Sequence, residues 1–167
     1  MTESFHHRAY IAVGSNMGDK AGNCRKGIAG LEQSGNSRIR AVSPLYQTAP
    51  VDYEDQDRFV NAVVCIATGL EPASLLAELN AIEQAAGRCR KGPRFGPRTL
   101  DMDIIFFDNV VMNTGDLILP HPRMHKRRFV LQPLCDMDAD ILHPLLGKTV
   151  GFLLEQLDAD EQEIRLL

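Results

Sequence analysis

Short apolar runs alternate along this chain with segments in which apolar residues recur every three or four positions. Runs rich in Val, Ile and Phe, or alternating between apolar and polar positions, are typical of strands. They predict strands over residues 10–13, 38–46, 59–68 and 100–107. A turn at 108–109 and a short strand over 110–112, paired with strand 100–107, complete the strand pattern.

Helical spacing is most regular after Pro72, because proline suits the first turn of a helix. Leu75, Leu79 and Ile82 then follow at three- and four-residue steps. Gly87 supplies a stop. Further helices are predicted over residues 20–34, 129–134 and 150–157.

The first six predicted elements follow the order strand, helix, strand, strand, helix, strand. This order predicts an α+β fold with a ferredoxin-like β-α-β-β-α-β core, in which helices pack on an antiparallel sheet. With 167 residues the chain has the length of one domain. Residues 1–8 are polar and are expected to form a flexible leader.

The charge, the apolar runs and the cysteines of the chain exclude several classes of protein. The chain carries 18 basic and 22 acidic side chains, a formal charge of −4, which argues against a general nucleic-acid coat. No apolar run approaches the roughly 18 to 20 residues that cross a bilayer, and the N-terminus lacks an apolar signal core. We therefore expect a cytoplasmic protein that binds neither nucleic acid nor membranes. The cysteines lack metal-site spacing and are expected to be free thiols: Cys24, Cys65, Cys89 and Cys135.

The basic residues are concentrated in two blocks, at 87–98 and 119–129, which flank strand 100–107. Nine of the 18 lie between Arg88 and Arg128. The first block contains three glycines, two prolines and no acid, so it is expected to form an irregular loop that closes over an anion. A solvated surface loop is the alternative.

Two aspartates lie between these basic blocks. Asp101 and Asp103 alternate with apolar residues in the predicted strand, so they share one face, roughly 6.5 to 7 Å apart. Carboxylates at this spacing can bind divalent cations together with substrate phosphates. The alternative is that both face water or pair with Arg98. A metal–polyphosphate site is the favoured interpretation.

Two further segments bear on phosphate binding. His121 lies between two prolines in the second basic block, so its ring is expected at a fixed place where it could contact phosphate oxygens. The segment 14–18 matches neither Gly-x-Gly-x-x-Gly nor Walker A and is interpreted as a turn that directs the first helix. A structural surface role is the alternative for His121.

Four stretches resemble the 6-hydroxymethyl-7,8-dihydropterin pyrophosphokinase family, in the right order and spacing. The most characteristic is Arg-Phe-Gly-Pro-Arg-Thr-Leu-Asp-Met-Asp-Ile-Ile at 94–105. The others are 10–16, 46–50 with Asn61, and 119–121 with Arg127 and Phe129. The resemblance spans roughly residues 10–134.

This resemblance implies a ferredoxin-like fold and a reaction of folate biosynthesis. In it, the β,γ-pyrophosphoryl group of ATP is transferred to the hydroxymethyl oxygen of the pterin and AMP is released. By the same likeness, Asp101 and Asp103 hold two Mg²⁺ ions. The implied partners are ATP and the dihydropterin, and a monomer is expected.

The resemblance also implies roles for single residues. The catalytic group comprises Arg88, Arg98, Asp101 and Asp103. Nucleotide contacts are implied for Glu83, Arg90, Arg94, Ile104, His121 and Arg127. The pterin pocket comprises Thr48, Pro50, Asn61, Phe95 and Phe129, with rings that sandwich the substrate and an amide that recognises its edge.

Two other functions suit parts of this pattern. A two-metal nuclease also needs paired aspartates and arginines, although the acidic net charge and the lack of a third carboxylate count against it. A non-catalytic RNA-binding or nucleotide-sensing module would share the fold, but no aromatic RNA-binding motif is visible.

Overall fold

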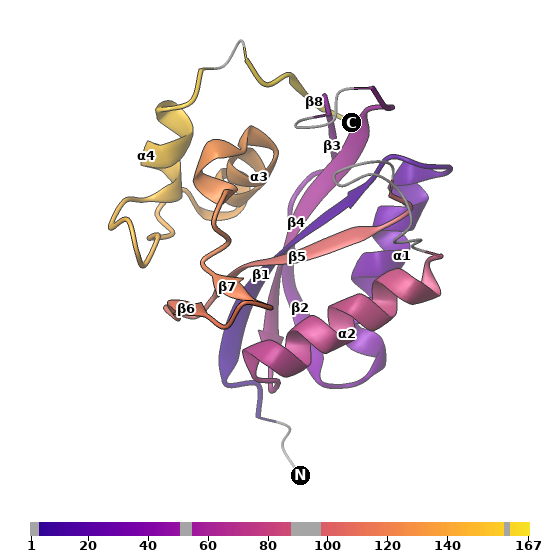
Figure 1. The fold of residues 1–167 in the computed structure, drawn as a ribbon, viewed down its shortest axis with the longest axis vertical. Helices are drawn as coiled ribbons and strands as arrows, with labels where there is room; N and C mark the ends of the chain where they lie inside the picture. Colours follow the sequence, from indigo (N-terminus) through magenta and orange to yellow (C-terminus); the bar gives the residue numbers. More distant parts are fainter. Residues whose placement is uncertain (1–3, 51–54, 88–97, 159–160) are drawn as a thin grey trace.

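The computed structural model describes residues 4–50, 55–87, 98–158 and 161–167. The chain folds into helices that flank a central sheet (Figure 1). The strands are β1 (His7–Ser15), β2 (Ser37–Val42), β3 (Tyr46–Thr48), β4 (Phe59–Thr68), β5 (Asp101–Phe107), β6 (Met112–Asn113), β7 (Ile118–Leu119) and β8 (Ile164–Leu166). The helices are α1 (Lys20–Gln33), α2 (Pro72–Ala85), α3 (Arg128–Asp138) and α4 (Val150–Glu155), with a 3₁₀ turn η1 (Met124–Lys126).

Within the described residues, the main sheet is antiparallel, with the order β5-β1-β4-β3-β8 and β2 beside β4. Helices α1 and α2 cover one face, and α3 and α4 cover the other (Figure 1). The predicted α+β fold with its ferredoxin-like core is therefore confirmed. The predicted helices at 20–34 and after Pro72 and the strand at 59–68 match α1, α2 and β4 within a few residues.

Each face of the sheet has its own apolar core. Met102 and Ile104 of β5 pack toward α1 and α2, whereas Ile105 packs toward α3 and α4. A β-bulge interrupts this alternation, because Tyr10 pairs with Phe106 and the next residue of β1 pairs with Ile104. Ile105 is the extra residue, so it and Phe106 both belong to the core beneath α3 and α4.

The predicted strand 38–46 is interrupted and forms two strands, β2 and β3. Ser43 takes the last place in the ladder, since its N–H donates to the Val63 carbonyl at 2.9 Å and its Oγ accepts from the Val63 N–H at 2.9 Å. Pro44 follows and has no N–H to donate, so the ladder stops there. β3 then resumes the pairing with β4.

The short strand predicted over 110–112 does not pair with β5. Met112–Asn113 instead forms a hairpin with Ile118–Leu119, closed by a turn in which the Thr114 N–H donates to the Leu117 carbonyl at 3.1 Å. The outer edge of β5 therefore bonds to the segment that follows β7. There the His121 N–H donates to the Ile105 carbonyl at 3.0 Å.

The first strand begins at His7, earlier than the predicted residue 10, and so includes the last two residues of the expected leader. Asp108, at φ 48°, fastens this end. Its Oδ1 accepts from the Arg8 N–H at 2.8 Å, and its Oδ2 accepts from His7 Nδ1 at 2.7 Å. His7 Nε2 donates to Glu71 at 3.2 Å. The hydrogen bond to Asp108, with a smaller contribution from Glu71, raises the pKa of His7 above 6.5.

Three of the four cysteines lie in the described part of the chain, and all three are free, as predicted. Burial raises the pKa of Cys24 to about 12 and that of Cys135 to about 11, so these thiols stay protonated at neutral pH. Cys89 lies outside the described residues. Among the described helices, none combines the length and apolar character that a bilayer crossing requires.

Protonated His7 should stabilise the fold, because it bonds to the carboxylates of Asp108, just after β5, and Glu71, just before α2. Its raised pKa means that this stabilisation is present below pH 6.5 and is lost as pH rises through the folded-state pKa. We predict that His7→Gln lowers the melting temperature most below pH 6.5, and that the difference from wild type narrows at alkaline pH. Thermal unfolding across pH tests this. The exposed neighbour gives the control His6→Gln, and a gap that widens with pH would contradict the assignment.

Candidate active site

The strand register aligns four positions in one row across the sheet: Tyr46, Asn61, Gly14 and Asp101, on β3, β4, β1 and β5. Paired residues on neighbouring strands project to the same face, so the side chains of Asn61 and Asp101 lie on one side with only a glycine between them. The hydroxyl of Tyr46 donates to Asp136 of α3, which identifies this as the α3 face. Two strand spacings, about 10 Å, separate Asn61 from Asp101.

Position 14 requires a glycine, because the side chain of Asn61 lies over it. A Cβ at position 14 would be 2.5 Å from Asn61 Oδ1, closer than side chains approach. Asn61 Nδ2 donates to Thr48 Oγ1 at 2.6 Å, and both residues are buried. The amide is therefore held in one orientation, with its oxygen directed over Gly14.

Asp101 and Asp103 lie on the same face of β5, as the sequence predicts. Both are half-buried, and they alternate with Met102 and Ile104, which are buried toward α1 and α2. The described residues contain no group of three or more potential protein ligands for a metal. The two carboxylates fit Mg²⁺, which takes oxygen ligands and commonly completes its shell with water and substrate phosphates.

His121 is fixed beside this strand by its main chain and its ring. Its N–H donates to Ile105, and its Nδ1 accepts from the Arg123 N–H at 3.2 Å, which places the imidazole proton on Nε2. Burial lowers the pKa of His121 to about 4, and the positive charges of Arg127 and Arg123 act in the same direction. At neutral pH the ring is therefore uncharged and can donate from Nε2.

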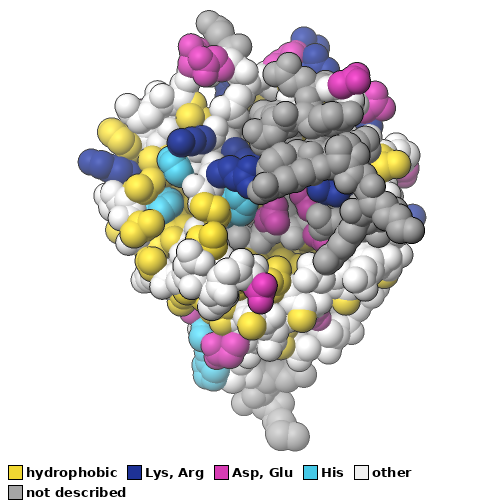
Figure 2. Space-filling model, in the orientation of Figure 1, with side chains coloured by type: hydrophobic (Ala, Val, Ile, Leu, Met, Phe, Trp, Pro, Cys, Tyr) yellow, Lys and Arg dark blue, Asp and Glu magenta, His cyan; other side chains and the backbone are white. Residues whose placement is uncertain are grey.

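Arg127 and Phe129 lie together at the start of α3. The Arg127 guanidinium carbon is 5.5 Å from the centre of the Phe129 ring, a cation–π geometry. Both side chains are half-buried, as is Arg98 just before β5. In Figure 2, basic, histidine and acidic side chains lie next to one another near the middle of the face shown. Opposite charges thus meet on this side of the molecule.

Asn16 organises the site, although in the sequence it stood out only as part of a turn and of the family-like stretch 10–16. It is buried, and it exchanges two hydrogen bonds with the main chain of Arg98, at 3.0 and 2.7 Å. Its Nδ2 donates to Gln56 Oε1 at 2.9 Å and to the Asp57 carbonyl at 3.2 Å. One side chain therefore joins the segment before β4 to the segment before β5. A polar amide directly after an apolar strand was the available signal.

Two residues predicted to contact the nucleotide, Glu83 and Ile104, are buried. Glu83 is 1% exposed, and its Oε1 accepts from the Met102 N–H at 2.8 Å. Its carboxylate therefore satisfies a backbone N–H at the outer edge of β5. The Ile104 side chain is 3% exposed and packs in the core on the face opposite the aspartates. Only the backbone of Ile104 is left to contact a nucleotide.

The remaining predicted residues divide into two groups. Pro50 is half-buried just after β3, close in sequence to Thr48. Four predicted site residues lie outside the described residues: Arg88, Arg90, Arg94 and Phe95. Most of the basic loop expected to close over an anion lies outside them as well.

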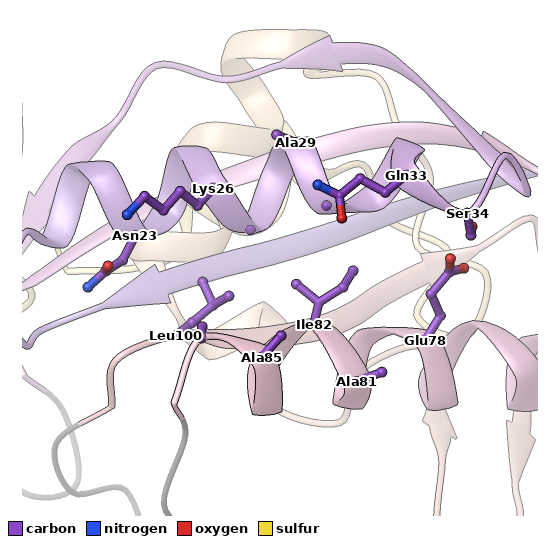
Figure 3. A pocket seen from close by; sticks show the side chains of 13 residues that line it. Asn23, Lys26, Ala29, Gln33, Ser34, Glu78, Ala81, Ile82, Ala85 and Leu100 are labelled. Atoms are coloured by element: carbon purple, nitrogen blue, oxygen red, sulfur yellow. The ribbon is translucent and has the colours of Figure 1, made fainter.

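A separate groove of about 720 Å³ lies between α1 and α2 (Figure 3). Leu100 and Ile82 lie between the two helices, with Lys26 and Glu78 toward opposite ends (Figure 3). Because α1 and α2 cover the face of the sheet opposite Asp101, this groove is not part of the candidate site.

Comparison with known proteins identifies the family. Residues 10–139 match the family model for 7,8-dihydro-6-hydroxymethylpterin-pyrophosphokinase (HPPK). The chain belongs to the HPPK family. As an HPPK it transfers a pyrophosphoryl group to hydroxymethyldihydropterin in folate biosynthesis, which confirms the resemblance and displaces the nuclease and RNA-binding alternatives.

Relatives of the HPPK chain support this assignment. A Bacillus subtilis 2-amino-4-hydroxy-6-hydroxymethyldihydropteridine pyrophosphokinase is 46% identical over 129 residues, 77% of each chain. The Haemophilus influenzae protein of the same name is 37% identical over 158 residues, 95% of this chain and 97% of its own. A crystal structure of a Plasmodium falciparum HPPK-DHPS triple mutant shares the fold at a TM-score of 0.71 and 17% identity. The match covers 90% of this chain and 43% of that one.

The contact between Gly14 and Asn61 gives a test of the pocket. We predict that Gly14→Ala displaces the Asn61 amide and lowers kcat/KM for the pterin at least tenfold, about 1.4 kcal/mol. Gly30→Ala is the matched control, since a Cβ there meets Ile82 at 3.3 Å, away from the row. Steady-state kinetics with varied pterin measure both. Wild-type kinetics in Gly14→Ala would exclude Asn61 from the pocket.

Proposed function

We propose that this chain transfers the β,γ-pyrophosphoryl group of ATP to the hydroxymethyl oxygen of the dihydropterin and releases AMP. Asp101 and Asp103 would hold two Mg²⁺ ions. The observation that carries the proposal is the row in which Asn61 and Asp101 share one face across Gly14. In this row the Asn61 amide, which suits a flat heterocycle, lies about 10 Å from the Asp101 carboxylate, which suits a cation.

The pterin would bind over Gly14, between Asn61 and Phe129. One N–H of Asn61 Nδ2 donates to Thr48, and this orients the amide so that its oxygen can accept from a ligand. An amide oxygen accepts hydrogen bonds, and the 2-amino-4-hydroxy edge of the substrate supplies N–H donors. The half-buried Phe129 ring can stack on the flat substrate. This orientation would direct the hydroxymethyl arm toward Asp101.

The nucleotide would bind along β5, among the groups that compensate its charge. Neutral His121 can donate from Nε2 to a phosphate oxygen, while Arg127 and Arg98 supply positive charge. Asn16 fixes the backbone of Arg98 and so the direction from which that side chain starts. Bound Mg²⁺ would neutralise phosphate charge and lower the pKa of the acceptor hydroxyl. Phosphoryl-type transfer needs mainly this positioning and charge compensation from the protein.

One assay tests the reaction. The protein is incubated with ATP, Mg²⁺ and 6-hydroxymethyl-7,8-dihydropterin, and the nucleotide products are separated. We expect AMP in amounts equal to the pterin diphosphate, and only when the pterin is present. Formation of ADP, or of AMP without the pterin, would contradict the proposal.

The carboxylate pair gives a second test. Asp101→Asn and Asp103→Asn keep the side-chain volume but weaken cation binding, so we predict at least a hundredfold loss of kcat, about 2.7 kcal/mol. The Mg²⁺ concentration for half-maximal activity should rise as well. Asp116→Asn, at an exposed position between β6 and β7, is the control. Near-normal kcat in either Asp101→Asn or Asp103→Asn would remove that residue from the metal site.

A further inference from the structure

The C-terminal residues 161–167 connect two parts of the candidate site that are far apart in sequence. β8 pairs with β3, with Ile164 opposite Thr48, and the Ala49 N–H donates to the Glu163 carbonyl at 3.2 Å. Glu163 also pairs with Arg58 at 2.9 Å. The segment therefore runs beside the strand that carries Thr48, one residue of the proposed pterin pocket.

The same segment reaches the start of α3 through Gln162. Its Oε1 accepts from the Arg128 N–H at 2.8 Å, and its Nε2 donates to the Lys126 carbonyl at 2.9 Å. Its own carbonyl accepts from Arg128 Nη1 at 3.2 Å. The side-chain amide thus bonds to the main chain on both sides of Arg127, as a neighbouring strand would.

The hydrogen bond from the Arg128 N–H to Gln162 supplies the N-terminal cap that α3 lacks from its own residues. The N-cap residue of α3 is Arg127, at φ −115° and ψ 107°, and its side chain makes no capping hydrogen bond. The first N–H groups of a helix need acceptors from outside the helix. Gln162 provides one for Arg128 from 34 positions away and holds the extended backbone from which Arg127 projects.

We propose that Gln162 is a positioning residue for Arg127 and Phe129, and that residues 161–167 fix these side chains relative to Thr48. The inference rests on the proposed function, since it needs Arg127 and Phe129 in the site. It concerns a segment beyond residues 10–139, the range that the family model matches. Residues 161–167 are thereby assigned a role in ligand binding.

The experiment compares three variants in the full-length protein. Gln162→Leu removes both side-chain hydrogen bonds at similar volume, and Gln162→Glu keeps an acceptor for Arg128 but cannot donate to Lys126. Glu161→Gln, at the exposed neighbouring position, is the control. KM for ATP, KM for the pterin and kcat are measured at a temperature where circular dichroism shows each variant folded.

We expect Gln162→Leu to raise KM for ATP about fivefold or more, the effect of losing one helix cap, with a smaller change in kcat. Gln162→Glu should fall between Gln162→Leu and wild type, and it keeps the test decisive if Gln162→Leu does not fold. Glu161→Gln should match wild type. Unchanged KM for ATP in both Gln162 variants would overturn the positioning role.

A double-mutant cycle separates positioning from general stability. If Gln162 acts through Arg127, adding Gln162→Leu to Arg127→Ala should raise KM for ATP little further. Additive effects would overturn the inference. A wild-type chain that forms no AMP from ATP and the pterin would instead overturn the proposed function. The two failures are thus distinguishable.

Discussion

The antiparallel pairing of β1 with β4 on one side and β5 on the other is the constraint on which the site depends. It fixes which residues of three separate segments lie opposite one another, and it puts Asn61 and Asp101 on a single face with Gly14 between them. A slip of one residue in either ladder would turn one of these side chains to the opposite face. The long ladders and the two apolar cores that flank them hold this register.

Local sequence patterns were sufficient for the longer elements of the fold. Apolar runs and helical spacing identified β4, β5, α1 and α2, because each buries a face whose period is visible in the sequence. The shared face of the two aspartates was predictable for the same reason, since charged residues that alternate with apolar ones inside a strand lie on one side. The break at Pro44 was visible as a proline, but the alternation around it favoured one continuous strand.

Other features depended on contacts between distant residues, which local patterns alone do not identify. Asn16 bonds to Arg98, 82 positions away, and Gln162 bonds to Arg128 across 34 positions. β8 is only three residues long, too short for its apolar and polar positions to predict a strand or its pairing with β3. The burial of Glu83 and its hydrogen bond from the Met102 N–H are likewise not visible in the sequence.

The buried carboxylate of Glu83 also affects how the molecule meets other molecules. β5 is an outer strand of the sheet, and an outer strand with free hydrogen-bonding groups can recruit a strand from another chain. Here the Met102 N–H is taken by Glu83 and the Ile105 carbonyl by His121. These contacts interrupt the row of groups that an incoming strand would need. The backbone contacts of the strand that bears Asp101 and Asp103 thus protect it from pairing with a strand of another chain.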